Sequence, residues 1–199
     1  NGVLKKASKY LRNKSSSRIF SEISSLYNDQ DVTYFRCQDT NFLSINQKVL
    51  KELANLIDES NMPIFLYIET RPETINERSI DLLKKLRVDG VGMGLELASE
   101  SFRKSSLNRF PSQEKIIRAF KLLRKAGIKR TTYNILGLPN ETEEMIHETI
   151  EFNRLLDPDN MTVSFFSPYL GTPEQQKAQS IGDFSSYEFN MDDQVRTVS

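Results

Sequence analysis

Five short runs rich in apolar and β-branched residues recur along the chain, separated by stretches with helical periodicity. Each run is nearly continuous in apolar residues, whereas a strand with one wet face would alternate. This pattern is typical of parallel strands that are covered on both faces. We therefore predict five buried strands, in DVTYFRC from Asp31, PIFLYIET from Pro63, VGMGLE from Val91, RTTYNILGL from Arg130 and MTVSFF from Met161.

The stretches between the runs predict amphipathic helices. Residues 46–60 carry apolar side chains at a period of 3.6, and the same spacing recurs in RSIDLLKKL and again before Gly127. A glycine there suits the left-handed residue that follows many helices. Asn140, with Glu143 three residues later, predicts the start of a further helix.

Strand and helix alternate at intervals of roughly 30 residues, which is the length of one βα unit. Such alternation predicts a parallel sheet with right-handed crossovers. The fold class is therefore α/β, either barrel-like or doubly wound. One interval is longer because ASESFRKSSLNRFPS follows the third run, which predicts an extra loop. The residues after Gly182 have no clear period.

Polar or charged residues follow every predicted strand. In both parallel architectures ligands bind at the carboxyl ends of the strands. A sheet with a purely structural role would not need polar groups at all five ends. The candidates are, in chain order, Gln38, Asp39 and Asn41, then Glu69 and Arg71, then Glu96, Ser99 and Glu100, then Asn134 and Gly137, and finally Ser164, Tyr169 and Thr172.

Structural explanations for these candidates stay open. Glu69 and Arg71 could form a weak surface ion pair, and Glu96 could be the first exposed residue after its strand. The glycines of VGMGLE either allow close packing or a bulge, or let a ligand approach the backbone. The segment GLPNET is either a turn before a helix or a helix N-terminus that presents free N–H groups.

Composition narrows the function classes. The chain has 199 residues, 38% of them hydrophobic and 27% charged, with a formal net charge of zero, so no global field favours nucleic acid or membranes. The single histidine, His147, lies among acidic residues and is predicted to be on the surface, which removes a histidine triad or zinc site. The single cysteine, Cys37, is predicted to be a small core residue. No apolar stretch reaches the roughly 20 residues of a membrane span and no signal peptide opens the chain, so cytoplasmic is the default location.

Four segments occur in order: CQDTNFL, ETRPETI, GMGLELASE…LNR and ILGLPNETEEM…PYLGTP. Together they resemble the radical S-adenosylmethionine (radical SAM) enzymes over about residues 9–180. The pattern is most similar to the branch that includes cobalamin-dependent members, methylthiotransferases and elongator-type acetyltransferases. The resemblance implies a partial, TIM-like (β/α)6 barrel, in which the five runs are strands two to six.

The resemblance also implies a [4Fe–4S] cluster on a CxxxCxxC loop after the first strand, which cleaves S-adenosylmethionine (SAM) to a 5′-deoxyadenosyl radical. Such a cluster requires three thiolates on one loop, and this chain has only Cys37. We therefore expect a fragment that starts after the loop, binds no metal and is inactive alone. The expected organisation is a basic segment at 1–16, a barrel core at 17–182, and a tail or the start of a further segment at 183–199.

Site residues follow from the same resemblance. The side chains that would bind the methionyl, ribose and carboxylate parts of SAM are Asp39, Asn41, Glu69, Arg71, Glu96 and Arg109. An arginine–carboxylate pair is often bidentate, so Arg109 would fix orientation as well as charge. The backbone from Ile135 to Gly137 would lie beside the adenine. The residues expected to face substrate are Ser164, Phe166 and Tyr169.

The sequence does not predict the substrate, which could be a small molecule, a protein or RNA. A parent enzyme would need a reducing partner such as flavodoxin or ferredoxin, and in this branch could also use cobalamin. No membrane is expected among its partners. Two alternatives remain: a degenerate barrel without a cluster that serves as a binding or interaction module, and an α/β enzyme of another chemistry. Against the second, no titratable pair dominates the acidic candidates. A CxxxCxxC motif upstream would favour the enzyme over the degenerate module.

Overall fold

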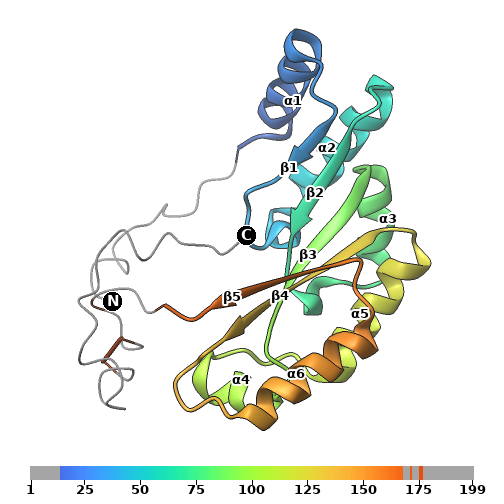
Figure 1. Cartoon of the computed structure of the whole chain (residues 1–199). Coiled ribbons are helices and arrows are strands. Elements are labelled where there is room, and N and C mark those ends of the chain that lie inside the picture. Colours follow the sequence, from blue (N-terminus) through green and yellow to red (C-terminus); the bar gives the residue numbers. More distant parts are fainter. Residues whose placement is uncertain (1–13, 168–170, 172–174, 177–199) are drawn as a thin grey trace. The chain divides into compact units, whose positions relative to one another are not determined.

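The computed structural model describes residues 14–167, 171, 175 and 176 (Figure 1). Five strands alternate with six helices and two short 3-10 helices, as the apolar runs predicted. The elements are α1 Ser16–Gln30, β1 Tyr34–Arg36, η2 Phe42–Ser44, α2 Gln47–Ser60, β2 Phe65–Glu69, η3 Pro72–Thr74, α3 Glu77–Lys85, β3 Val88–Glu96, α4 Glu100–Ser106, α5 Gln113–Lys125, β4 Lys129–Leu136, α6 Glu143–Leu156 and β5 Asn160–Phe165.

The strands form one five-stranded sheet in the order β1-β2-β3-β4-β5. The pairings of β1 with β2, β2 with β3 and β4 with β5 are all parallel. Each strand therefore lies beside the next one in the chain, with a helix in each connection. This is the order of a (β/α) barrel, and it confirms the predicted α/β class with five parallel strands of a partial TIM-like barrel.

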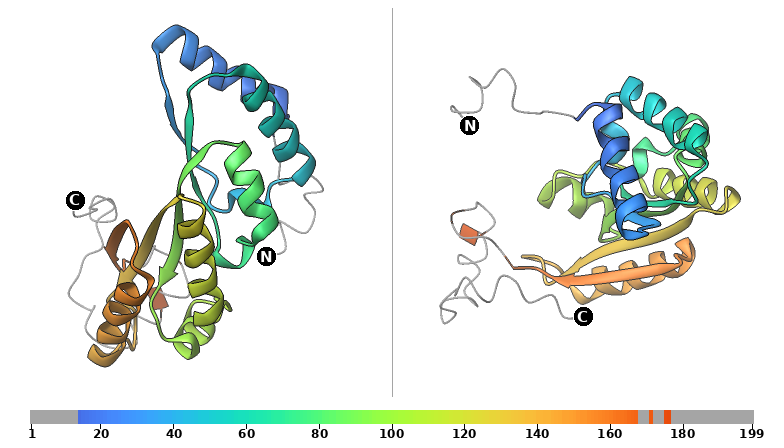
Figure 2. Two further views of the ribbon diagram at one scale, coloured as in Figure 1. Left: turned by 90° about the vertical axis from the view of Figure 1, so that its right-hand side faces the viewer. Right: turned by 90° about the horizontal axis from the view of Figure 1, so that it is seen from above.

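The chain divides into two compact units, 1–92 with 118–130, and 93–117 with 131–199. In the first unit, the period predicted for residues 46–60 is confirmed, because Leu50, Leu53 and Ile57 of α2 are buried. Helix α1 packs beside α2, and α2 beside α3, as Figure 2 shows. A capping box between Asn76 and Ser79 starts α3.

In the second unit, a small apolar cluster forms where β3 and β4 end. It consists of Leu97, Phe102 and Leu138, with Ile135 and Phe166 among the partly buried side chains packed against it. The cluster thus gathers residues that follow β3, β4 and β5, and it anchors the loops that leave these strands.

A buried polar network joins β4 to α6. Asn153 accepts a hydrogen bond from the Thr132 hydroxyl at 2.7 Å and donates to the Asn134 side chain at 2.9 Å. Its amide also donates to the Thr149 carbonyl at 2.9 Å. Because buried polar groups need partners, the network fixes how α6 lies on β4.

Three predictions need correction. The five runs were predicted to be strands buried on both faces, but the residues of β5 are all exposed and those of β1 are exposed or half-buried. These are the two edge strands of the sheet. The segment after β3 contains a short helix, α4, where the sequence predicted only a loop. Helix α6 is capped by the Thr142 side chain, which accepts from the Met145 amide, and not by Asn140, which has a left-handed φ of 68°. Gly127 does follow α5 with a φ of 74°, as predicted. Among the residues that the structure describes, no helix is long and apolar enough to cross a membrane.

Candidate functional site

At the ends of β1 and β2, in the first unit, a hydrogen-bond network orders the loops. The Thr70 hydroxyl donates to the Asn41 side chain at 2.9 Å and accepts from the Leu43 amide at 3.4 Å. The Thr70 amide in turn donates to the Gly92 carbonyl of β3. Asn41 is therefore held at the carboxyl end of the strands, where the sequence placed it.

The charged candidates of the first unit do not pair with one another. Glu69 pairs with Arg36 at 2.6 Å, so the expected alternative of a Glu69–Arg71 pair is not what forms. The Arg36 guanidinium also lies 5.4 Å from the centre of the Tyr67 ring. Arg71 and Asp39 are exposed at the ends of β2 and β1.

Cys37 is half-buried and has no disulfide partner. Burial raises the pKa of its thiol to about 12, and the nearby Asp39 carboxylate adds to the rise. A thiol is a nucleophile or metal ligand only as the thiolate, so Cys37 is poorly suited to either role. It is half-buried, whereas the sequence predicted a core residue. His147 is exposed on α6 and lies 3.7 Å from Glu143, as predicted.

The end of β3, in the second unit, carries the most unusual backbone among the site candidates. Glu96 has a φ of 62°, and the Leu97 amide donates to the Leu95 carbonyl across it at 2.9 Å. This is a three-residue turn with the rarer, strained hand. A Cβ on Gly94 would overlap Oε1 of Glu96, so Gly94 provides the room that the carboxylate occupies. Strain of this kind clusters at functional sites.

Arg109, from the segment after α4, approaches Glu96. One guanidinium nitrogen lies 3.5 Å from Oε1 of Glu96, and the two side chains are 38% and 12% exposed. This separation exceeds an ordinary hydrogen bond. Within the part of the chain that the structure describes, no hydrogen bond engages the Arg109 guanidinium, so its donors remain open to an anionic ligand. The structure thus brings together two of the residues that the resemblance placed near the methionyl carboxylate and ribose.

Burial raises the pKa of Glu96, while Arg109 and Arg103 oppose that rise. A raised folded-state pKa means that Glu96 favours folding when it is protonated, and that this contribution is lost as pH rises from near 4.5 through the folded pKa. We therefore expect Glu96→Gln to raise the free energy of unfolding at pH 7 relative to its effect at pH 4. Urea titrations at both pH values would measure this, and an equal effect at both would contradict it.

Arg103 was not among the candidates predicted from the sequence, although this residue is almost completely buried, with 1% exposure. It donates to the carbonyls of Leu97 at 2.7 Å, Ala98 at 2.8 Å and Pro111 at 2.9 Å. The only available signal was its place beside Phe102 in a segment with otherwise polar residues, which does not distinguish it from a surface arginine.

At the end of β4, Glu141 accepts from the amides of Gly137 at 2.5 Å and Leu138 at 3.2 Å. The Gly137 and Leu138 amides are therefore already engaged, which favours the turn over the anion-site interpretation of GLPNET. At β5, Ser164 is exposed, and Phe166 packs against the apolar cluster. Tyr169, the third residue expected to face substrate, lies outside the described residues.

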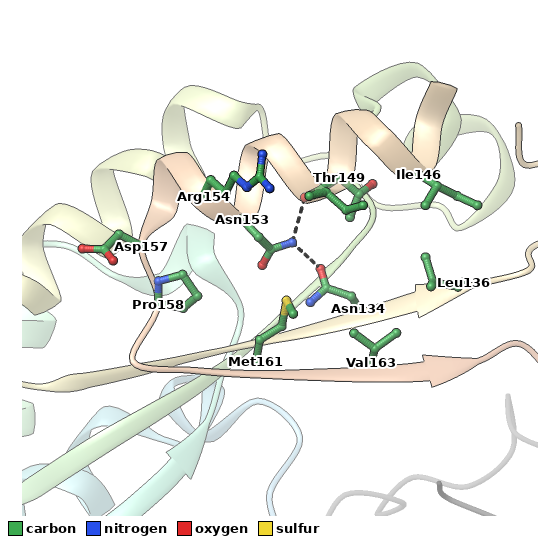
Figure 3. Close-up of a pocket in the computed structure, with 11 residues that line it drawn as sticks. Asn134, Leu136, Ile146, Thr149, Asn153, Arg154, Asp157, Pro158, Met161 and Val163 are labelled. Atoms are coloured by element: carbon green, nitrogen blue, oxygen red, sulfur yellow. Dashed lines mark hydrogen bonds between the residues drawn. The ribbon is translucent and has the colours of Figure 1, made fainter. Parts of the chain in front are cut away.

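A groove of about 490 Å³ lies between α6 and the strands β4 and β5 (Figure 3). Its apolar lining includes Ile146 and Ile150 of α6 and Met161 and Val163 of β5. Figure 3 shows Asn153 pointing from α6 toward Asn134 on β4. None of the side chains proposed to bind SAM lines this groove, so it is separate from the Glu96–Arg109 pair.

The residues present differ in how well they fit the two implied cofactors. Among the described residues, no group of three or more histidine, cysteine or acidic side chains could hold a metal, and the sequence has one cysteine. The chain therefore does not fit an iron–sulfur cluster. SAM carries a carboxylate, an ammonium group and ribose hydroxyls, and the open donors of Arg109 beside the Glu96 carboxylate fit such a ligand.

A family profile described as the Radical SAM superfamily matches residues 6–152. The chain therefore belongs to the radical SAM superfamily, which confirms the resemblance. It is 27% identical over 161 residues to an uncharacterized methyltransferase from Pyrococcus horikoshii, covering 81% of this chain and 35% of that protein. It is 27% identical over 180 residues to the anaerobic magnesium-protoporphyrin IX monomethyl ester cyclase of Rubrivivax gelatinosus, covering 86% and 32%.

A solved structure supports the fold. The radical SAM methyltransferase TsrM from Kitasatospora setae, with cobalamin and a [4Fe–4S] cluster bound, superposes with a TM-score of 0.64 and 21% identity over 77% of this chain and 29% of that one. The chain spans 35% and 32% of the two relatives, so it corresponds to about a third of their length.

Proposed function

We propose that this chain is the SAM-binding barrel segment of a radical SAM enzyme whose cluster ligands lie elsewhere in the parent protein. In that parent, bound SAM would supply a 5′-deoxyadenosyl radical for hydrogen abstraction from substrate. The observation that carries the proposal is the Glu96–Arg109 pair, in which a carboxylate on a left-handed backbone lies 3.5 Å from a guanidinium that has no hydrogen bond within the described residues. The segment alone is expected to be inactive, because it has one cysteine.

Within the second unit, we propose that Arg109 binds the methionyl carboxylate and that Glu96 accepts hydrogen bonds from the ribose or ammonium group. The backbone of residues 135–137 would lie beside the adenine. Because the Gly137 amide is taken by Glu141, that contact would use carbonyl groups or packing. The substrate would be approached from Ser164, Phe166 and Tyr169.

Within the first unit, we propose that Asp39 and Asn41 contact the methionyl ammonium group, since both are acceptors at the end of β1. Asn41 is supported by its fixed orientation on Thr70. Glu69 and Arg71 would contact the ribose and carboxylate. The Glu69–Arg36 pair, at 2.6 Å, holds Oε1 of the carboxylate at the end of β2.

For the parent we also propose a small-molecule, protein or RNA substrate and a reductant of the flavodoxin or ferredoxin type. Cobalamin is a further cofactor of this proposal, supported by the similarity to TsrM. We place the parent in the cytoplasm. The lone cysteine favours one competing function, a degenerate barrel that binds a ligand or partner without radical chemistry.

Anaerobic iron–sulfur reconstitution of the full-length parent, beside the 199-residue chain, tests the proposal. We expect visible absorption and bound iron in the parent, neither in the chain, and release of 5′-deoxyadenosine when the parent is reduced with SAM. If the parent also binds no cluster, the proposal fails and the degenerate module takes its place.

A further inference from the structure

Arg103 occupies a position that a purely structural loop would not require. A buried arginine is expensive unless its donors are satisfied, and this one is 1% exposed. It donates to the carbonyls of Leu97, Ala98 and Pro111, all of them neutral. Its Nε has no partner within the described residues. The acceptors come from two separate segments, one directly after Glu96 and one directly after Arg109.

The first segment contains the strained turn. A non-glycine residue with a positive φ persists only where its surroundings over-determine it. Residues 97 and 98 immediately follow Glu96, and Arg103 grips both of their carbonyls from one nitrogen. The Ala98 amide donates to the Thr149 hydroxyl at 3.0 Å. Both backbone polar groups of Ala98, the second residue after Glu96, are therefore hydrogen-bonded to side chains.

The second segment carries Arg109. The backbone carbonyl of Arg103 accepts from the Arg109 amide at 3.0 Å and from the Leu107 amide at 3.1 Å. Its side chain holds Pro111 from the other end. Arg103 therefore fixes the chain on both sides of Arg109, with its backbone on one side and its guanidinium on the other.

We propose that Arg103 is a positioning residue. It holds the Glu96 carboxylate and the Arg109 guanidinium in the arrangement that binds SAM, and it does not contact SAM itself. The inference rests on the proposed function of that pair. A planar fork can bond two segments at once, which a lysine ammonium cannot do in the same geometry. The requirement is therefore for the shape of the side chain as well as its charge.

Arg103→Lys in the full-length, reconstituted protein tests this inference. We expect the variant to remain folded and to lose affinity for SAM by about tenfold, the size of coupling within one hydrogen-bond network. SAM affinity is measured by equilibrium dialysis under anaerobic conditions. Hydrogen exchange of the Leu97 and Arg109 amides, which needs no ligand, is expected to become faster.

Arg130→Lys is the matched control, because Arg130 is also a buried arginine, with 6% exposure, but lies at the amino end of β4. It is expected to leave SAM affinity unchanged even if it lowers the melting temperature. In an Arg109→Ala background, Arg103→Lys is expected to have little further effect on affinity, because Arg103 acts through Arg109.

These measurements distinguish the positioning role of Arg103 from the proposed function of the Glu96–Arg109 pair. If Arg109→Ala lowers SAM affinity while Arg103→Lys does not, the positioning role is wrong and the proposed function stands. If Arg109→Ala has no effect, the proposed function of the pair fails, and only the hydrogen-exchange result bears on Arg103. Full additivity of the two substitutions, or an equal loss in Arg130→Lys, would reduce Arg103 to a stabilising residue.

Discussion

If the proposed site binds SAM, Arg109→Ala is expected to lower the affinity of the full-length parent protein for SAM by about 10- to 100-fold, because a charge-assisted hydrogen bond contributes about 1.5–3 kcal/mol. The guanidinium is 38% exposed and has no hydrogen bond among the described residues. Its removal therefore costs the fold little, and the melting temperature is expected to stay within a few degrees of wild type. Equilibrium dialysis with radiolabelled SAM measures the effect.

Arg118→Ala is the control for this substitution. Arg118 pairs with Glu77 at 2.9 Å, and both side chains are 67% exposed. Such a pair contributes little to stability, and neither residue lies at the carboxyl end of a strand. Equal SAM affinity in Arg109→Ala and wild type would remove Arg109 from the binding site.

Asn153→Ala is expected to lower the free energy of unfolding by about 3 kcal/mol, because each buried group that loses its partner costs about 1–3 kcal/mol. The substitution would leave the Thr132 hydroxyl and the Asn134 side chain without the partner that both now share. It would also remove the side-chain hydrogen bond to the Thr149 carbonyl. Denaturant titration of the protein measures the loss.

Leu155→Ala, on the same helix, is the contrasting variant. The side chain of Leu155 is apolar, whereas that of Asn153 is polar, but Leu155 is 65% exposed. Its truncation is therefore expected to change stability by less than about 0.5 kcal/mol. If Leu155→Ala cost as much as Asn153→Ala, helix propensity or burial of α6 in the parent would dominate, and the network would carry less than we infer.

The sequence located the strands because each run is rich in apolar and β-branched residues. Burial on both faces is most complete for β3, whereas β5 is exposed along its whole length. The five runs overlap all five strands, and the 3.6 period located α2, α3 and α5. The candidate side chains at the strand ends could also be named from the sequence, because the carboxyl ends of parallel strands meet at one edge of the sheet. The family resemblance named both Glu96 and Arg109 as SAM-binding residues, and the structure places their side chains 3.5 Å apart.

The remaining features depend on tertiary contacts that leave no local pattern. Glu96 adopts a left-handed backbone without being glycine or asparagine, so nothing in GMGLELASE announces the turn. Arg103 is charged and sits in a polar segment, so its burial could not be read from periodicity. The pairing of Glu69 with Arg36 crosses from β2 to β1, whereas sequence proximity suggested Arg71.

Because Glu96 has a left-handed backbone, we expect selection for stability and selection for SAM binding to favour different residues at position 96. Glycine tolerates a positive φ without strain, and an uncharged residue avoids the burial of a carboxylate. A library of variants at position 96, screened for thermal resistance alone, should therefore drift toward glycine or asparagine. The same library screened for retention of SAM should return glutamate. The difference in the free energy of unfolding between the two enriched variants would measure how much folding stability is lost at this position in exchange for ligand binding.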